Sequence, residues 1–311
     1  MEISFANPHY LWLLLLLPFF ALIAFLILLH GKKDIEKFIS FRALDFFFKK
    51  ANFFYLYLRK HLLIFLLRAA IYLVVVLIIS GATFYYRGKV EEQSLIIAID
   101  SSGSMLADDM PPNRLEAVKE TIKDFIGKMP QKSRIAVLSF SGSAYIEQGL
   151  SSEEEAIKSI DNIQISPISG TSIGSALKTS INILSIEKKP KSILLITDGG
   201  ENILSDEALY KLISEVEKEH ITINVIGIGQ IEGAHLPGTE LISTLNEQLL
   251  KEIAKNTKGA YYRAETKQSL VDAYNRILSS AKLNIPISLN LALIILFVVL
   301  FFIDYIFVRY G

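Results

Sequence analysis

Three long apolar runs, two near the beginning of the chain and one at its end, constrain this sequence more than any other feature. They cover about residues 10–29, 66–86 and 287–308 of 311, and each is close to the roughly 20 residues that cross ~30 Å of hydrocarbon as a helix. They raise the mean hydropathy to +0.39, which is high for a protein whose whole surface meets water. We therefore expect three transmembrane helices, two before a soluble region and one (within residues 283–311) after it.

The distribution of basic residues predicts how these helices are oriented. The loop 30–61 contains eight Lys and Arg, whereas the ten residues before the first run contain none. Loops rich in Lys and Arg stay in the cytoplasm, so we expect residues 30–61 inside and residues 90–282 on the other side of the membrane. We expect the first run to be retained, because a cleaved signal peptide carries its positive charge before the apolar run and a small-residue cleavage site after it.

A few polar and aromatic residues lie within or beside these runs. We expect Arg68 to extend its side chain to the membrane surface, and Asn290 and Asp304, near the ends of the third run, to contact lipid headgroups. The aromatic residues 84–86 fit an interfacial aromatic belt at the end of the second helix. Residues 53–67 are expected to form an interfacial helix or to lengthen this span.

Short apolar runs alternate with amphipathic stretches between residues 90 and 282. The apolar runs are continuous rather than alternating, which indicates strands buried on both faces, as in a parallel sheet. Alternation of such strands with helices predicts a doubly wound α/β fold with a mostly parallel sheet, here with a short antiparallel edge strand at 143–148. The predicted parallel strands are 94–100, 134–140, 192–197, 221–228 and 260–263. The predicted helices are 113–128, 152–162, 172–186, 205–219, 246–257 and 267–281.

Five side chains with oxygen donors follow these strands or open a helix between them: Asp100, Ser102, Ser104, Thr171 and Asp198. Ligands of open α/β sheets bind outside the carboxyl ends of the strands, so we expect these side chains at one edge of the sheet. Their donors are hydroxyl and carboxylate oxygens, which suit a hard cation such as Mg²⁺. Alternate residues of an extended loop project to one side, so the first three can share an ion. The sequence predicts a divalent-metal site here.

Other kinds of chemistry are disfavoured by composition and by missing motifs. Residues 90–282 hold 20 Lys and Arg against 27 Asp and Glu, a formal charge of −7, which argues against nucleic-acid binding. The chain has no cysteine, which excludes thiol nucleophiles and thiolate zinc sites, and no G-x-S-x-G elbow. Asp100 lacks the second acid, two residues on, of aspartyl phosphotransferases. Asp108, Asp109 and Glu201 are interpreted as solvated loop carboxylates. We expect a binding protein, not an enzyme.

The five oxygen donors, in this order and on these elements, resemble the metal-ion-dependent adhesion site (MIDAS) of von Willebrand factor type A (VWA) domains. The resemblance covers roughly residues 90–282. It implies a VWA, Rossmann-like fold in which a D-x-S-x-S motif (Asp100, Ser102, Ser104), a later Thr (Thr171) and a later Asp (Asp198) hold Mg²⁺ or Mn²⁺. It also implies a protein partner that supplies an acidic ligand to the metal.

The whole chain resembles the bacterial membrane proteins of the BatA/BatB type. The segments 5–11 and 104–115, and the long insertion 230–246 after Gly227-Ile228-Gly229, are similar to that family. The resemblance implies a multi-pass protein of the bacterial inner membrane with its VWA domain on the periplasmic side. It further implies a role in aerotolerance or stress, together with a MoxR-type AAA+ ATPase and other VWA proteins. The alternative is a structural anchor that assembles through its VWA domain without metal-dependent ligand capture.

Overall fold

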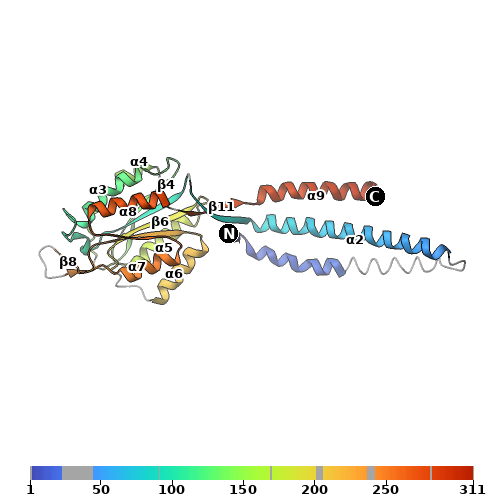
Figure 1. The fold of residues 1–311 in the computed structure, drawn as a ribbon, viewed down its shortest axis with the longest axis horizontal. Coiled ribbons are helices and arrows are strands. Elements are labelled where there is room, and N and C mark those ends of the chain that lie inside the picture. The colour runs from blue at the N-terminus through green and yellow to red at the C-terminus, as the bar shows by residue number, and fades with distance from the viewer. Residues whose placement is uncertain are drawn as a thin grey trace. The chain divides into compact units, whose positions relative to one another are not determined.

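The structure, a computed structural model, describes residues 2–22, 45–90, 92–168, 170–200, 206–236, 242–280 and 282–310. The chain forms two compact units (Figure 1): Met1–Tyr85 together with Ile287–Gly311, and Tyr86–Pro286. Residues 30–44 of the predicted basic loop 30–61 and the flanking acid Glu201 lie outside the described residues. From Asp45 onward that predicted loop is helical, because helix α2 spans Asp45–Ser80.

The described residues of the first unit include three apolar helical segments. A 3-10 helix, η1 (Pro8–Leu15), continues as an α-helix to Leu22, and residues 23–29 of the predicted first span lie outside the described residues. Helix α9 spans Asn290–Tyr310, two to three residues later than predicted. Within α2 and α9, the stretches Leu62–Ser80 and Asn290–Arg309 are long and apolar enough to cross a membrane.

The prediction that the second span continues to Tyr86 is wrong, because α2 ends at Ser80 and residues 82–88 form a strand. Gly81 makes the turn with a left-handed φ of +67°, which glycine adopts without strain. Strand β2 (Ala82–Gly88) pairs antiparallel with β1 (Glu2–Phe5), and β11 (Leu283–Ser288) completes a three-stranded sheet in the order β1-β2-β11. The aromatic residues 84–86 therefore belong to a strand and not to a helix end.

The helices of the first unit are joined by polar contacts as well as apolar ones. Arg68 Nε in α2 lies 3.3 Å from Asp304 Oδ1 in α9, and these helices run side by side (Figure 1). Tyr72 donates a 2.6 Å hydrogen bond to the carbonyl oxygen of Leu13. Arg68 and Asp304, which we predicted would each reach the membrane surface separately, instead form an ion pair between the two helices.

The second unit is built on a six-stranded sheet in the order β10-β7-β6-β3-β4-β5. All pairings are parallel except that of β5 with β4, so the predicted doubly wound α/β fold and its antiparallel edge strand are confirmed. The strands are β3 (Ser94–Asp100), β4 (Arg134–Phe140), β5 (Ala144–Ser151), β6 (Lys191–Thr197), β7 (Thr222–Ile228) and β10 (Tyr261–Ala264).

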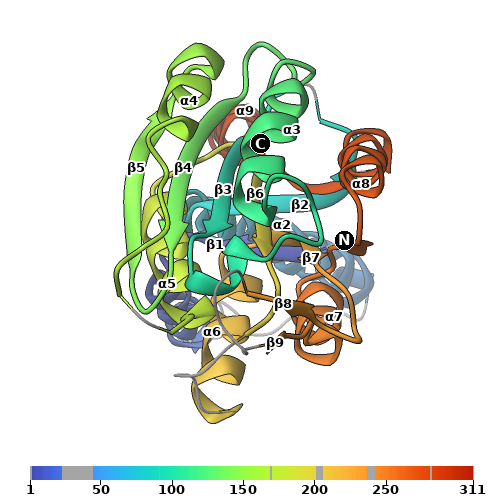
Figure 2. The ribbon, with the colours of Figure 1, turned by 90° about the vertical axis from the view of Figure 1, so that its left-hand side faces the viewer.

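Helices cover both faces of this sheet (Figure 2). One face packs against α3 (Arg114–Ile126), α4 (Glu153–Ile160) and α8 (Lys267–Ser280), and the other against α5 (Ile173–Leu184), α6 (Asp206–Lys218) and α7 (Glu247–Asn256). Because side chains alternate along a strand, Ile97 and Ile99 of β3 enter the first core, whereas Ile96 and Ala98 enter the second. Burial on both faces explains why the apolar runs in the sequence are continuous. The polar residues of the predicted site therefore lie at the ends of the strands.

Candidate metal centre

The loops that carry the predicted site residues are held together by backbone hydrogen bonds at the carboxyl edge of the sheet. The Ser101 amide donates to the Phe140 carbonyl at 2.7 Å, and the Ser166 amide donates to the Ser101 carbonyl at 2.8 Å. The Ser172 amide donates to the Ser141 carbonyl at 2.7 Å. These bonds connect the ends of β3 and β4 to the segment that opens α5. The side chains on these loops are thus placed by a rigid framework rather than by free loops.

Asp100, the last residue of β3, is fully buried and both of its carboxylate oxygens accept hydrogen bonds. Oδ1 accepts from the Ser102 amide at 2.9 Å, and Oδ2 accepts from the Thr197 hydroxyl at 2.6 Å. Thr197 ends β6, the neighbouring strand, and its hydroxyl also accepts from the Gly199 amide at 3.0 Å. The carboxylate is therefore oriented by two strands at once.

The two predicted serine ligands lie side by side in the loop after β3. Ser104 belongs to a short 3-10 helix, η2 (Gly103–Leu106), and its hydroxyl oxygen lies 2.8 Å from that of Ser102. Ser102 is only 3% exposed, whereas Ser104 is half-buried. The two hydroxyls lie at one place as predicted, but the first turn of η2 brings them together and not the alternation of an extended loop.

Thr171 and Asp198 face a common space beside Gly200. A methyl group at Gly200 would lie 3.3 Å from Asp198 Oδ1 and 3.9 Å from Thr171 Oγ1. Asp198 Oδ1 also accepts from the Gly200 amide at 3.1 Å. Both side chains are buried, and glycine at this position leaves room between them.

The two carboxylates are close enough to influence each other's charge. Burial, followed by repulsion from Asp198, raises the pKa of Asp100 to about 7. Such a shift means that two negative charges are held in a place with little solvent to separate them. A cation at this place would relieve the repulsion, so the electrostatics favour metal binding.

A buried arginine, which the sequence analysis did not identify, holds the other side of Asp198. Arg114, the first residue of α3, is fully buried and its Nη1 lies 3.4 Å from Asp198 Oδ2. The same Nη1 donates to Ser243 Oγ at 2.8 Å, and Ser243 Oγ in turn donates to Asp198 Oδ2 at 2.8 Å. These contacts keep Oδ2 occupied and leave Oδ1 turned toward Thr171.

Arg114 also binds the loop before its own helix. Its Nε and Nη2 donate to the two oxygens of Asp109 at 2.8 and 2.7 Å, a bidentate pair with fixed geometry. Gly229 (φ +109°) lies against the guanidinium, because a methyl group there would be 2.5 Å from Nη2. The interpretation of Asp109 as a solvated carboxylate is therefore wrong, since its side chain is 6% exposed. Asp108, in contrast, is exposed as predicted.

The donor set fits a divalent cation of the Mg²⁺ type. Among the residues that the structure describes, no three His, Asp or Glu side chains group closely enough to hold a metal. A metal here would therefore rely on hydroxyl oxygens together with the two aspartates. Hydroxyl and carboxylate oxygens are the donors that Mg²⁺ and Mn²⁺ accept, and the crowded pair of buried carboxylates supplies the attraction.

Comparison with protein families places the central part of the chain. Residues 95–201 match the model of the von Willebrand factor type A domain, in agreement with the mostly parallel α/β sheet of the second unit. The curated relatives include UPF0353 proteins of Nocardia farcinica, 25% identical over 206 residues, and of Mycolicibacterium paratuberculosis, 26% identical over 196 residues. Each match covers 59% of this chain, and 62% and 58% of the two relatives. The matched part thus spans about three-fifths of the length of these relatives.

Solved structures give a similar result. An aerotolerance-related membrane protein from Bacteroides fragilis is 28% identical, with a TM-score of 0.54 over 60% of this chain and 99% of that chain. BatB from Bacteroides thetaiotaomicron is also 28% identical, with a TM-score of 0.51 and the same coverage. The chain is thus similar to these BatB-type proteins over the part that includes the match to the VWA model.

A more distant structure shares the fold alone. Proximal thread matrix protein 1 from the mussel byssus is 21% identical, with a TM-score of 0.53 over 66% of this chain and 49% of that chain. That structure holds zinc in its MIDAS motif.

Proposed function

We propose that this protein captures a protein ligand through a divalent metal held by Asp100, Ser102, Ser104, Thr171 and Asp198. The observation that supports this most is the pair of buried carboxylates, Asp100 and Asp198, beside the adjoining hydroxyls of Ser102 and Ser104. Mg²⁺ or Mn²⁺ would be held by the three hydroxyls, with the aspartates binding directly or through water. Such a cation offers an incompletely neutralised positive charge that an acidic side chain of a partner can bind.

Within this proposal the chain's own residues have distinct roles. Thr197 and the Ser102 amide orient Asp100, while Arg114 and Ser243 orient Asp198. The proposed role is binding rather than catalysis, and the related BatB-type proteins suggest that it serves aerotolerance or a stress response.

A calorimetric titration tests the metal site directly. The full chain in detergent is expected to bind one Mg²⁺ or Mn²⁺, and saturating metal is expected to raise its unfolding temperature, because an unfolded chain cannot assemble these ligands. Absence of both binding heat and a melting shift at millimolar metal would favour the alternative, a structural anchor that assembles through its VWA domain.

Metal binding is expected to strengthen as pH rises from 6 to 8. With its pKa near 7, Asp100 of the metal-free protein is mostly protonated at pH 6, and a bound metal displaces that proton. The apparent association constant should therefore increase about tenfold over this range. Titrations in two buffers that differ in ionisation enthalpy measure the released proton. An affinity that is independent of pH would contradict this account of the Asp100 carboxyl.

The raised pKa of Asp100 also determines how the stability of the metal-free protein changes with pH. The folded pKa of Asp100, near 7, lies above its ordinary value of 3.8, so the folded state binds more protons than the unfolded state between these values. The contribution of Asp100 to the free energy of unfolding is therefore greatest below about pH 4 and falls as pH rises toward 7. Chemical denaturation in chelator between pH 5 and 8 is expected to show this decline, and Mg²⁺ is expected to offset it.

We further propose a multi-pass location in the bacterial inner membrane, with the VWA domain on the periplasmic side. Because the chain has no cysteine, Ser40→Cys and Ser185→Cys each introduce a single thiol. An impermeant thiol reagent is expected to label the second variant but not the first in intact spheroplasts, and both after lysis. Labelling at position 40 alone in intact cells would reverse the proposed orientation.

The partners on the two sides of the membrane are also proposals. A MoxR-type AAA+ ATPase would meet this protein through its cytoplasmic segment, residues 30–61, whose basic residues suit an acidic surface. Other VWA proteins of the same type are proposed as neighbours in the envelope. Both proposals depend on the family resemblance and on the eight Lys and Arg of that segment.

A further inference from the structure

Strand β10 leaves one edge of the six-stranded sheet open. It pairs only with β7, in the parallel register Tyr261↔Val225 and Arg263↔Gly227. The carbonyls of Ala260 and Ala264 accept from amides at the β7 side. Because backbone groups alternate in direction along a strand, those of Tyr261 and Arg263 point away from the sheet. Within the part of the chain that the structure describes, no hydrogen bond reaches these outward groups.

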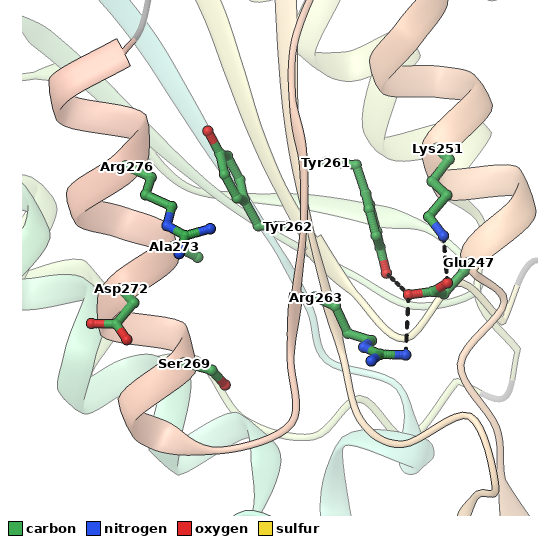
Figure 3. Close-up of a pocket in the computed structure, with 9 residues that line it drawn as sticks. All are labelled: Glu247, Lys251, Tyr261, Tyr262, Arg263, Ser269, Asp272, Ala273 and Arg276. Carbon is green, nitrogen blue, oxygen red and sulfur yellow. Dashed lines mark hydrogen bonds and ion pairs between the residues drawn. The ribbon is translucent and has the colours of Figure 1, made fainter.

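A groove of about 480 Å³ lies over this edge, between α7 and α8. Figure 3 shows that the side chains on its two sides differ. Tyr261, Arg263 and Lys251 lie on the α7 side, around Glu247. Tyr262 lies on the opposite side, facing α8. The groove thus offers unpaired backbone groups, with Lys251 and Arg263 around Glu247 on one side and Tyr262 and Ala273, flanked by the opposite charges of Asp272 and Arg276, on the other.

The charge of the groove is opposite to that of the domain around it. Three cations, on Lys251, Arg263 and Arg276, line it against two acids, Glu247 and Asp272, although residues 90–282 carry −7 in total. Glu247 is already engaged, because Lys251 lies 2.5 Å from it and Tyr261 donates to it at 3.0 Å. Arg263 pairs through Nε with Glu265 at 3.1 Å, and its Nη1 lies 3.7 Å from Glu247, so among the described contacts its Nη2 is the guanidinium nitrogen left for a ligand. An incoming carboxylate would therefore find a partner on the α7 side.

We propose that β10 binds an extended segment of a partner protein in which acidic and apolar residues alternate. The segment adds a seventh strand to the sheet by pairing with the outward N–H and C=O groups of Tyr261 and Arg263. This mode of binding is β-strand addition. Its acidic side chains face Lys251 and Arg263, and its apolar side chains face Tyr262 and Ala273. This site is separate from the proposed metal centre and does not depend on it.

The test uses the full chain in detergent and a fluorescent eight-residue peptide that alternates valine and glutamate. Two matched peptides serve as controls, one with lysine in place of glutamate and one N-methylated on the backbone amides of its pairing edge. The acidic peptide is expected to bind at least tenfold more tightly than either control, and to slow amide hydrogen exchange in the segment containing Arg263. Equal binding of all three peptides would overturn the proposal.

Variants of the protein distinguish the contribution of backbone hydrogen bonds to peptide binding from the contribution of charged side chains. Arg263→Pro removes an outward N–H without touching the bonds to β7, so it is expected to weaken binding about tenfold more than Arg263→Ala. Lys251→Glu should weaken binding severalfold, whereas Lys255→Glu, an exposed position on the same helix outside the groove, should not. Should Arg263→Pro unfold, the N-methylated peptide makes the same test from the ligand side. Self-association of the wild type that Arg263→Pro abolishes would assign the edge to a second copy instead, and would overturn the proposal.

Discussion

Asp100→Asn is expected to abolish binding of Mg²⁺ and Mn²⁺ to the full chain while leaving the protein folded. The substitution keeps the size of the side chain and an acceptor for the Ser102 amide, but it removes one of the two negative charges that attract the cation. Loss of a residue that holds a metal or orients its ligands weakens affinity by about 10- to 100-fold, and loss of a site charge adds to this. Calorimetry should show no binding heat at millimolar metal.

The metal-free stability of this variant distinguishes a lost site from a damaged fold. Because burial and Asp198 raise the pKa of Asp100, a neutral amide relieves an electrostatic cost at pH 8. The chelator-treated variant should therefore unfold at the same temperature as the wild type or slightly higher. Asp124→Asn, at an exposed position of α3, serves as the matched control and should retain full binding. Metal binding by Asp100→Asn with wild-type affinity would exclude Asp100 from the site.

Arg114→Met is expected to have the largest effect on stability of any single substitution considered for this chain. The side chain is fully buried and contacts Asp109, Asp198 and Ser243 at distances of 2.7 to 3.4 Å. Its removal leaves buried carboxylates without their cation, a change that costs about 3–5 kcal/mol. For a unit of this size that corresponds to a fall of about 6–20 °C in unfolding temperature, which thermal melts in chelator would detect.

Two further variants serve as controls for the loss of stability expected in Arg114→Met. Arg134→Met removes an ion pair with Glu187 of similar length, 2.8 Å, but Arg134 is 46% exposed, so the loss should stay below about 1 kcal/mol. Arg114→Lys keeps the charge and loses the bidentate geometry, and should fall between the two. If Arg114→Met melts within about 2 °C of the wild type, the buried contacts with Asp109 and Asp198 contribute little and their ordering role is excluded.

The α/β fold of the second unit could be predicted from the sequence because the patterns that indicate its strands and helices are local. Each strand is a short apolar run buried on both faces, so β3 and β4 were predicted to the residue, and the helices appear as amphipathic stretches between such runs. The sheet β1-β2-β11 was missed. Aromatic residues 84–86 follow a long apolar helix directly, and aromatic side chains suit both a membrane interface and a strand. Only the partner strand at the amino terminus decides between them.

The candidate site could be predicted only in part, for a related reason. Aspartates and hydroxyl residues at the ends of strands are visible in the sequence, because the carboxyl ends of parallel strands meet at one edge. Arg114 and Ser243 gave no such signal. Arg114 follows a helix N-cap, where an exposed arginine is ordinary, and its partners Asp198 and Ser243 lie 84 and 129 residues away. Such long-range partners follow from how the loops pack, and residue type and spacing do not reveal them.

The contact between Arg68 and Asp304 has a consequence for how the protein is made. The two residues are 236 positions apart, one in the first long helix and the other near the end of the chain. At ~5–20 residues per second, the ribosome releases Arg68 on the order of 10 to 50 seconds before its carboxylate partner exists. Throughout that time the α2 cation must be hydrated or find another partner. A chain cut short before α9 would keep this cation without its carboxylate, so the ion pair between α2 and α9 forms only after α9 has been made.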